Sequence, residues 1–127
     1  MSPRYAILML LALSLMGFSG LNNQPNVYEF KLKDILGNDV PLSRYQGKVL
    51  LIVNVASECK HTKQYADLQA LYEQYSAEGL VVMGVPSNDF FNTEPGTEEE
   101  ISAFCTQKYA VTFPMFGKTS VKGKKAH

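Results

Sequence analysis

Two almost uninterrupted apolar stretches of the chain predict strands that are buried on both faces. They are VLLIVNVA at residues 49–56 and LVVMGV at residues 80–85, both rich in β-branched residues, and such runs are typical of parallel strands covered by helices. Between them, apolar side chains recur every three or four positions, which predicts an amphipathic helix. These side chains are Tyr65, Leu68, Leu71, Tyr72 and Tyr75, followed by Gly79 as a stop signal. Strand, helix and strand in this order predict a parallel βαβ unit.

A second pattern predicts a hairpin ahead of this unit. Apolar and charged residues alternate over VYEFKLK at residues 27–33, which indicates a half-buried strand. The turn-forming sequence GND follows, and residues 40–42 supply a short apolar partner. We therefore expect an N-terminal antiparallel pair.

A third pattern predicts a helix after the βαβ unit. Thr97 followed by Glu100 has the spacing of a capping box, and Ile101, Phe104, Cys105 and Tyr109 then share one helical face. Residues 112–121 are expected to be extended. The order of elements as a whole predicts an α/β fold.

The N-terminus has the pattern of a targeting segment. Arg4 precedes an uncharged apolar run of thirteen residues, 6–18, and small residues follow at a suitable cleavage position. We expect residues 1–20 to be a signal peptide and residues 21–127 to be the folded domain. The protein is then secreted or periplasmic, without stable membrane association after cleavage. An uncleaved membrane anchor is the alternative, although the run is shorter than the ~20 residues of a spanning helix.

Composition narrows the function classes. The chain has 127 residues, 46% of them hydrophobic, and twelve basic residues balance twelve acidic ones. This composition indicates one globular domain without the net charge that nucleic-acid binding favours. The two histidines are His61 and the terminal His127, and no cluster of ligands accompanies either. We therefore predict no metal site and no cofactor.

Cys59 is the strongest candidate for chemistry. It follows the first buried strand and comes at or just before the start of the next helix, where the helix dipole and Lys60 favour an anion. The motif is not C-x-x-C, so a second thiol can come only from Cys105. A single thiolate at this place can attack a peroxide and become a sulfenic acid. A buried structural cysteine, or half of a structural disulfide, is the alternative.

Several motifs in register resemble the glutathione peroxidase family. They are NVASECKHTKQYADLQALYEQY around Cys59, GLVVMGVPSNDF from residue 79, NTEPGTEEEI from residue 92 and VTFPMF from residue 111. The resemblance implies a thioredoxin-like fold with Cys59 as the peroxidatic cysteine. It also places Cys105 where thioredoxin-reduced members of the family carry their resolving cysteine, and the helix with Cys105 would have to unwind or move for the two thiols to bond. A core residue on that helix face is the alternative for Cys105.

The sequence departs from the family pattern in three places. Lys60 and His61 stand where Gly and an aromatic residue usually follow the peroxidatic cysteine. Asp89 aligns with the family's catalytic glutamine, where it either polarises the site or caps its own loop. The family's last antiparallel strands and closing helix, with their tryptophan and asparagine, are expected to be missing after His127.

Two functions follow as hypotheses. The first is a peroxidase that reduces hydrogen peroxide or organic hydroperoxides in the response to oxidative stress, with glutathione or a thioredoxin-like protein as the electron donor. The second is a non-catalytic, truncated relative in which the two cysteines are only structural.

Overall fold

The computed structural model describes residues 25–127, so the predicted signal peptide at residues 1–20 lies outside the described residues. Strands and helices follow one another in the order that the sequence predicts. They are β1 (Lys31–Lys33), β2 (Asp39–Pro41), β3 (Val49–Val55), α2 (Gln64–Tyr75), β4 (Leu80–Pro86) and α3 (Glu98–Tyr109), with short 3₁₀ turns between several of them. None of the helices in this part of the chain is both long enough and apolar enough to cross a bilayer.

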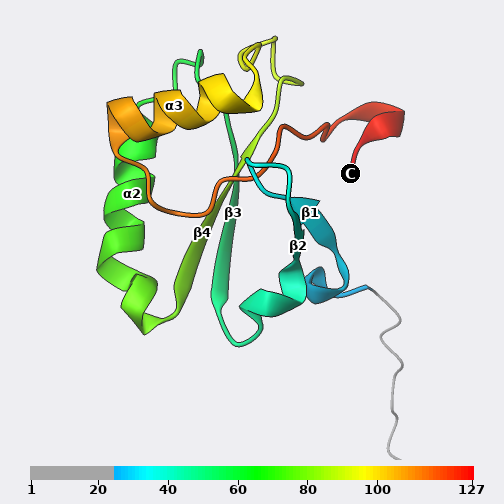
Figure 1. The fold of residues 1–127 in the computed structure, drawn as a ribbon, viewed down its shortest axis with the longest axis vertical. Coiled ribbons are helices and arrows are strands. Elements are labelled where there is room, and N and C mark those ends of the chain that lie inside the picture. The colour runs from blue at the N-terminus through cyan, green and yellow to red at the C-terminus, as the bar shows by residue number, and fades with distance from the viewer. Residues whose placement is uncertain (1–24) are drawn as a thin grey trace, which may run out of the picture.

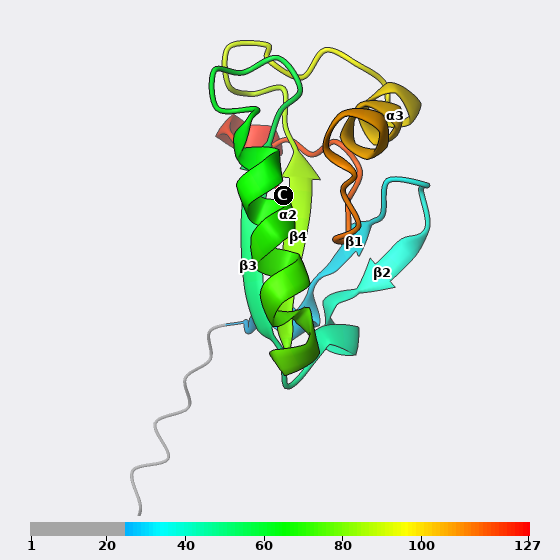
Figure 2. The ribbon, with the colours of Figure 1, turned by 90° about the vertical axis from the view of Figure 1, so that its left-hand side faces the viewer.

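The predicted parallel βαβ unit is confirmed. β3 and β4 run parallel in a regular register from the pair Val49 and Leu80 to the pair Val55 and Pro86. α2 connects them and lies along one side of the two strands, while the β1–β2 hairpin lies on the other side (Figures 1 and 2). Gly79 has the positive φ of 102° that glycine tolerates best, and it ends the helical segment as predicted.

β4 is the central strand of the molecule. Its side chains alternate between two hydrophobic cores, since Val82 packs toward the helices whereas Met83 and Val85 pack toward the hairpin. Val82 and Met83 have no exposed surface. The prediction of a strand buried on both faces is therefore right for β4.

The same prediction is wrong for β3. Val49 is 68% exposed and Ile52 is 48% exposed. Within residues 25–127, β3 pairs along one edge only, with β4. Its helix-facing side packs through Leu51, Val53 and Val55, but no comparable layer covers Ile52 on the other side. An apolar run indicates that a strand is suited to burial. It does not indicate whether helices or loops pack against one face of the strand or against both.

The hairpin begins later than the sequence predicts. Val27–Glu29 form a 3₁₀ turn, not a strand. A local capping box explains the difference, because the Asn26 side chain accepts from Tyr28 N at 2.9 Å and Glu29 Oε1 accepts from Asn26 N at 3.4 Å. These local bonds compete with strand pairing. The antiparallel pair of β1 and β2 then forms as expected.

α3 begins at the predicted capping box, with Thr97 Oγ1 accepting from Glu100 N at 3.3 Å and Glu100 Oε2 accepting from Thr97 N at 2.8 Å. After α3 the chain runs beside β4. There Met115 makes a parallel bridge to Gly84, and the neighbouring residue makes an antiparallel bridge to Asp34. Residues 112–121, which were expected to be extended, thus pair with strands only through two single bridges.

Candidate active site

Cys59 lies in a turn between the end of β3 and the start of α2. Thr62 fixes this turn, because its hydroxyl accepts from Cys59 N at 2.8 Å and lies 2.7 Å from Cys59 O and 3.0 Å from Ala56 O, either of which can accept its proton. Thr62 N also donates to Cys59 O at 3.0 Å. The regular helix begins only at Gln64, so the thiol precedes the helix by one turn of irregular chain. The position agrees with the predicted strand edge.

The Cys59 sulfur is half-buried and chemically accessible. The backbone N–H of His61 points at Sγ over 3.5 Å, and a backbone donor is the kind of partner that a thiolate accepts. The Lys60 and His61 side chains are exposed. The two residues that depart from the family pattern therefore add exposed polar side chains next to the thiol.

A cavity of about 460 Å³ opens beside the sulfur. Its walls are mainly apolar and come from β3, from α2 and from the loop after β4, with Val53, Val55, Leu68, Phe90 and Phe91 among them. The cavity leaves room for a small or apolar molecule beside the thiol. Phe91 stands at the rim with 95% of its surface exposed.

The rim loop has an unusual backbone. Phe91 and Asn92 adopt positive φ values of 60° and 53°, which are uncommon for residues other than glycine and cost more for a bulky aromatic residue. This conformation turns the loop so that Thr93 lines the cavity and its carbonyl accepts from Glu58 N at 2.9 Å. The loop is thereby joined to the turn of Cys59.

Asp89, the residue expected at the glutamine position, does not line the cavity of Cys59. Its Oδ2 accepts from Val121 N at 2.6 Å, from Ser120 Oγ at 3.0 Å and from Lys122 N at 3.0 Å. The Val121 N–H is the main reason that the pKa of Asp89 lies below its usual range. Asp89 holds the C-terminal segment, and Thr93 is the polar residue of this loop that lines the cavity of Cys59, together with Phe90 and Phe91. Sequence reasoning missed Thr93 because nothing in the spacing shows which residue a strained loop turns inward.

Cys105 lies on α3 with 1% of its surface exposed, and both cysteines are free. Burial raises the pKa of the Cys105 thiol, and the neighbouring Tyr65 hydroxyl opposes that effect. Tyr65 belongs to the same core cluster as Cys105 and also lines the cavity of Cys59. One tyrosine is thus shared by the surroundings of the two thiols, and the resolving role of Cys105 stays a prediction.

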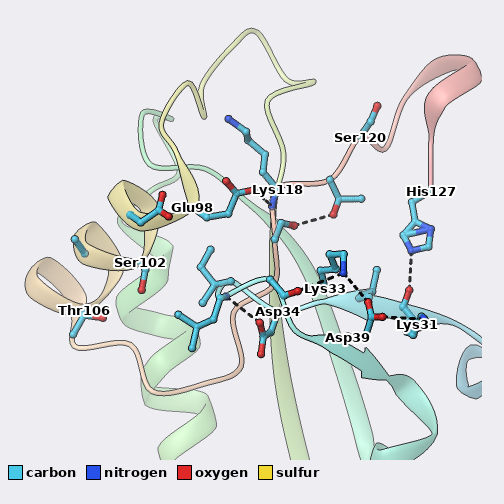
Figure 3. Close-up of a pocket in the computed structure, with 18 of the residues that line it drawn as sticks. Lys31, Lys33, Asp34, Asp39, Glu98, Ser102, Thr106, Lys118, Ser120 and His127 are labelled. Carbon is cyan, nitrogen blue, oxygen red and sulfur yellow. Dashed lines mark hydrogen bonds and ion pairs between the residues drawn. The ribbon is translucent and has the colours of Figure 1, made fainter.

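A larger groove of about 1120 Å³ lies between the hairpin, α3 and the C-terminal segment (Figure 3). It contains neither cysteine. Three of its four lysines are engaged, since Lys31 and Lys33 pair with Asp39 at 3.1 and 2.9 Å, and Lys118 Nζ donates to Gly96 O at 2.7 Å. The groove holds no thiol, so the cavity beside Cys59 is the better candidate. Over residues 25–127 there is no group of three or more His, Cys, Asp or Glu side chains that could hold a metal ion.

A comparison with known families identifies the family of this chain. The family model for glutathione peroxidase matches residues 27–127. The chain belongs to the glutathione peroxidase family. Its thioredoxin-like α/β fold is therefore established along with its family.

Members of the glutathione peroxidase family match this chain over most of its length. The glutathione peroxidase homolog BsaA of Bacillus subtilis is 50% identical over 102 residues, which are 80% of this chain and 64% of that protein. The glutathione peroxidase-like peroxiredoxin gpx1 of Schizosaccharomyces pombe is 48% identical over 96 residues, 76% of this chain and 61% of that protein. The crystal structure of T. cruzi GPX1 superposes with a TM-score of 0.60 at 33% identity, covering 81% of this chain and 61% of that one. The chain spans less than two thirds of the length of these relatives.

Proposed function

We propose that this protein is a thiol-dependent peroxidase in the response to oxidative stress. The observation that carries the proposal is the Cys59 sulfur, a free thiol on a fixed turn with a backbone N–H directed at it and an apolar cavity beside it. The Cys59 thiolate attacks one oxygen of a hydrogen peroxide or an organic hydroperoxide. An S–O bond forms, the O–O bond breaks, and the leaving oxygen takes up a proton as water or an alcohol. Cys59 is oxidised by two electrons to a sulfenic acid.

The sulfenic acid must then be reduced. The second free thiol, Cys105, supports an internal route in which a disulfide forms with loss of water and a thioredoxin-like protein reduces it. A relative named as a peroxiredoxin also supports a protein thiol as the donor. Glutathione, attacking Cys59 directly, is the other donor to test.

Peroxide consumption with each donor tests the proposal. Wild-type protein is given hydrogen peroxide or cumene hydroperoxide together with either glutathione or thioredoxin and the matching reductase. We expect Cys59→Ser to abolish turnover with both donors and Cys105→Ser to abolish turnover with thioredoxin only. Equal peroxide consumption by wild type and Cys59→Ser would contradict the peroxidase function and favour the non-catalytic hypothesis.

We also propose that the protein acts outside the cytoplasm, as a secreted or periplasmic protein. The support is the sequence of residues 1–20, with one basic residue, an apolar run and small residues at the end. N-terminal sequencing of the protein purified from its native compartment tests this. We expect a first residue near Leu21, and an intact Met1 would contradict cleavage.

A further inference from the structure

Phe91 combines two unfavourable features at the mouth of the Cys59 cavity. Its backbone has a positive φ of 60°, a region that crowds the Cβ of an aromatic residue. Its side chain is 95% exposed, so almost the whole ring lies in water. Both features lower stability, and strained residues of this kind occur most often at active sites and ligand sites. Phe91 is therefore a candidate for a role in binding.

Side chains of the loop after β4 hold this strained conformation. Asn88 closes the loop, because its Oδ1 accepts from Glu94 N at 2.9 Å and its Nδ2 donates to Asn92 Oδ1 at 3.4 Å. Inside the loop, Thr93 Oγ1 donates to the Phe90 carbonyl at 2.8 Å, across the two residues with positive φ. Strain persists only where the surrounding structure determines the conformation, and these hydrogen bonds supply that constraint.

The loop is also held against the turn of the thiol. The Thr93 carbonyl accepts from Glu58 N at 2.9 Å, one residue before Cys59. The loop and the turn lie at the same end of the molecule (Figures 1 and 2). Phe91 and Cys59 line one cavity. The exposed ring is therefore held at the entrance to the reacting sulfur.

The lining of the cavity fits a molecule with one polar end and an apolar body. Three polar residues of the lining follow the thiol directly in the sequence, namely Lys60, His61 and Thr62. The strand, the helix and the loop contribute mainly apolar side chains, among them Val53, Val55, Leu68, Phe90 and Phe91. A hydroperoxide group bonded to a hydrocarbon has this combination of polar and apolar parts.

The size of the cavity also favours a substrate larger than hydrogen peroxide. Its volume of about 460 Å³ is in the usual range for sites that bind small organic molecules. One water molecule takes up about 30 Å³ in the liquid, so hydrogen peroxide, with two oxygens, would fill a small part of this space. A hydrocarbon group would cover the apolar walls and displace water from them.

We propose that Phe91 contacts the substrate and makes this protein select hydroperoxides with an apolar hydrocarbon group over hydrogen peroxide. The inference rests on the proposed peroxidase function and deepens it, because it names the preferred substrate class and a residue that recognises it. The hydroperoxide group lies at the Cys59 sulfur, and the hydrocarbon group packs against the Phe91 ring. Burial of the ring in the complex gains the hydrophobic stabilisation that the free protein lacks.

Oxidation of Cys59 without any reductant tests this contact. The full reduced chain is mixed with an excess of hydrogen peroxide or cumene hydroperoxide, and the remaining Cys59 thiol is alkylated at intervals and counted by mass spectrometry. The rate constant with cumene hydroperoxide divided by that with hydrogen peroxide gives the selectivity ratio. Free cysteine, measured in the same way, gives the intrinsic ratio of the two reagents. We expect the wild-type ratio to exceed it.

We expect Phe91→Gly to lower the selectivity ratio about tenfold, the scale of one lost apolar contact in a substrate pocket. Glycine accepts a positive φ, so the loop keeps its shape and the melting temperature should not fall. Phe91→Asn is the second variant, because asparagine also accepts a positive φ and is polar; it should give the same low ratio. Phe91→Tyr keeps the ring and should keep the wild-type ratio.

Asn92→Gly is the matched control. Asn92 is the next residue of the same loop and has a positive φ of 53°, but it does not line the cavity. This substitution relaxes the backbone in the same way as Phe91→Gly and keeps the aromatic ring, so the selectivity ratio should stay at the wild-type value. An equal fall in Asn92→Gly would assign the effect to the loop backbone and contradict the contact.

Two further results would overturn the inference. They are a wild-type selectivity ratio no higher than that of free cysteine, and a wild-type ratio in both Phe91→Gly and Phe91→Asn. Either result leaves the peroxidase proposal standing as long as Cys59 reacts with both peroxides much faster than free cysteine does. Failure of the peroxidase proposal looks different, because Cys59 would then react with neither peroxide faster than free cysteine.

Discussion

At the scale of single residues, Thr62 holds the turn of Cys59 in its conformation. Its hydroxyl joins the Cys59 amide to two carbonyls and so holds the backbone that carries the sulfur. Local side-chain bonds of this kind compensate for the absence of a glycine after the cysteine. Thr62, two residues before the helix, thus positions the backbone of the nucleophile.

Thr62→Val is therefore expected to reduce the reactivity of Cys59. The substitution keeps the shape of the side chain but leaves the Cys59 amide without its acceptor, which destabilises the turn by about 1–3 kcal/mol. We expect alkylation of Cys59 by iodoacetamide to slow by about tenfold at neutral pH, and Thr62→Ser should retain most of the wild-type rate. An unchanged rate in the valine variant would show that the backbone alone sets the turn.

Asp89 gives a second prediction at this scale, on stability against pH. Its folded pKa lies below the ordinary value of 3.8, so its contribution to stability is complete above that value and is lost as pH falls through the lower folded value. Asp89→Ala should lower the melting temperature at pH 7, and the difference from wild type should disappear near pH 2. Calorimetry at both pH values measures this. A difference that persists at pH 2 would assign the effect to packing, not to the carboxylate.

At the scale of elements, the sequence predicted most of the fold and less of the site. The elements of the βαβ unit and the capping box of α3 follow from periodicity and spacing, because each of these patterns is contained in a short stretch of sequence. The unequal burial of β3 and β4 could not be predicted, since two similar apolar runs do not reveal which strand becomes central. The same holds for Asp89 and Thr93, whose roles depend on a loop with positive φ values and on a segment 32 residues away.

The close approach of β4 to the C-terminal segment predicts the effect of one added methyl group. A Cβ at Gly84 would lie 2.5 Å from Met115 Sδ and 3.1 Å from Phe113 Cε2. Gly84→Ala should lower the free energy of unfolding by about 1–3 kcal/mol through overpacking. Chemical denaturation measures the loss, and Met115→Ala in the same chain should be less harmful than in wild type. Additive effects of the two substitutions would exclude this contact as the cause.

At the scale of the whole molecule, the uncovered side of β3 is the main departure from a closed fold. Ile52, which is 48% exposed, places apolar surface next to a strand edge that has no partner within residues 25–127. Exposed apolar strand edges favour pairing between molecules. The described part of the chain thus combines a complete cysteine turn with a sheet that is open on one side.

This open side predicts self-association. Ile52→Thr keeps the β-branched shape that suits a strand and removes apolar surface from the edge. We expect the variant to stay monomeric at concentrations where the wild-type chain self-associates, as measured by light scattering, with Val82→Thr in the buried core as a destabilising contrast. Equal association of wild type and Ile52→Thr would mean that another surface is responsible.

Through Asp89, the mouth of the thiol cavity is also connected to residues 120–122, which are distant in the sequence. Phe90 follows Asp89, whose carboxylate accepts from Val121 N. The ammonium group of Lys122 lies 4.1 Å from the centre of the Phe90 ring. Phe90 in turn forms a wall of the cavity. Displacement of residues 120–122 would remove both the cation above Phe90 and the amide that Asp89 accepts, so the shape of this cavity wall depends on a segment that does not itself line the cavity.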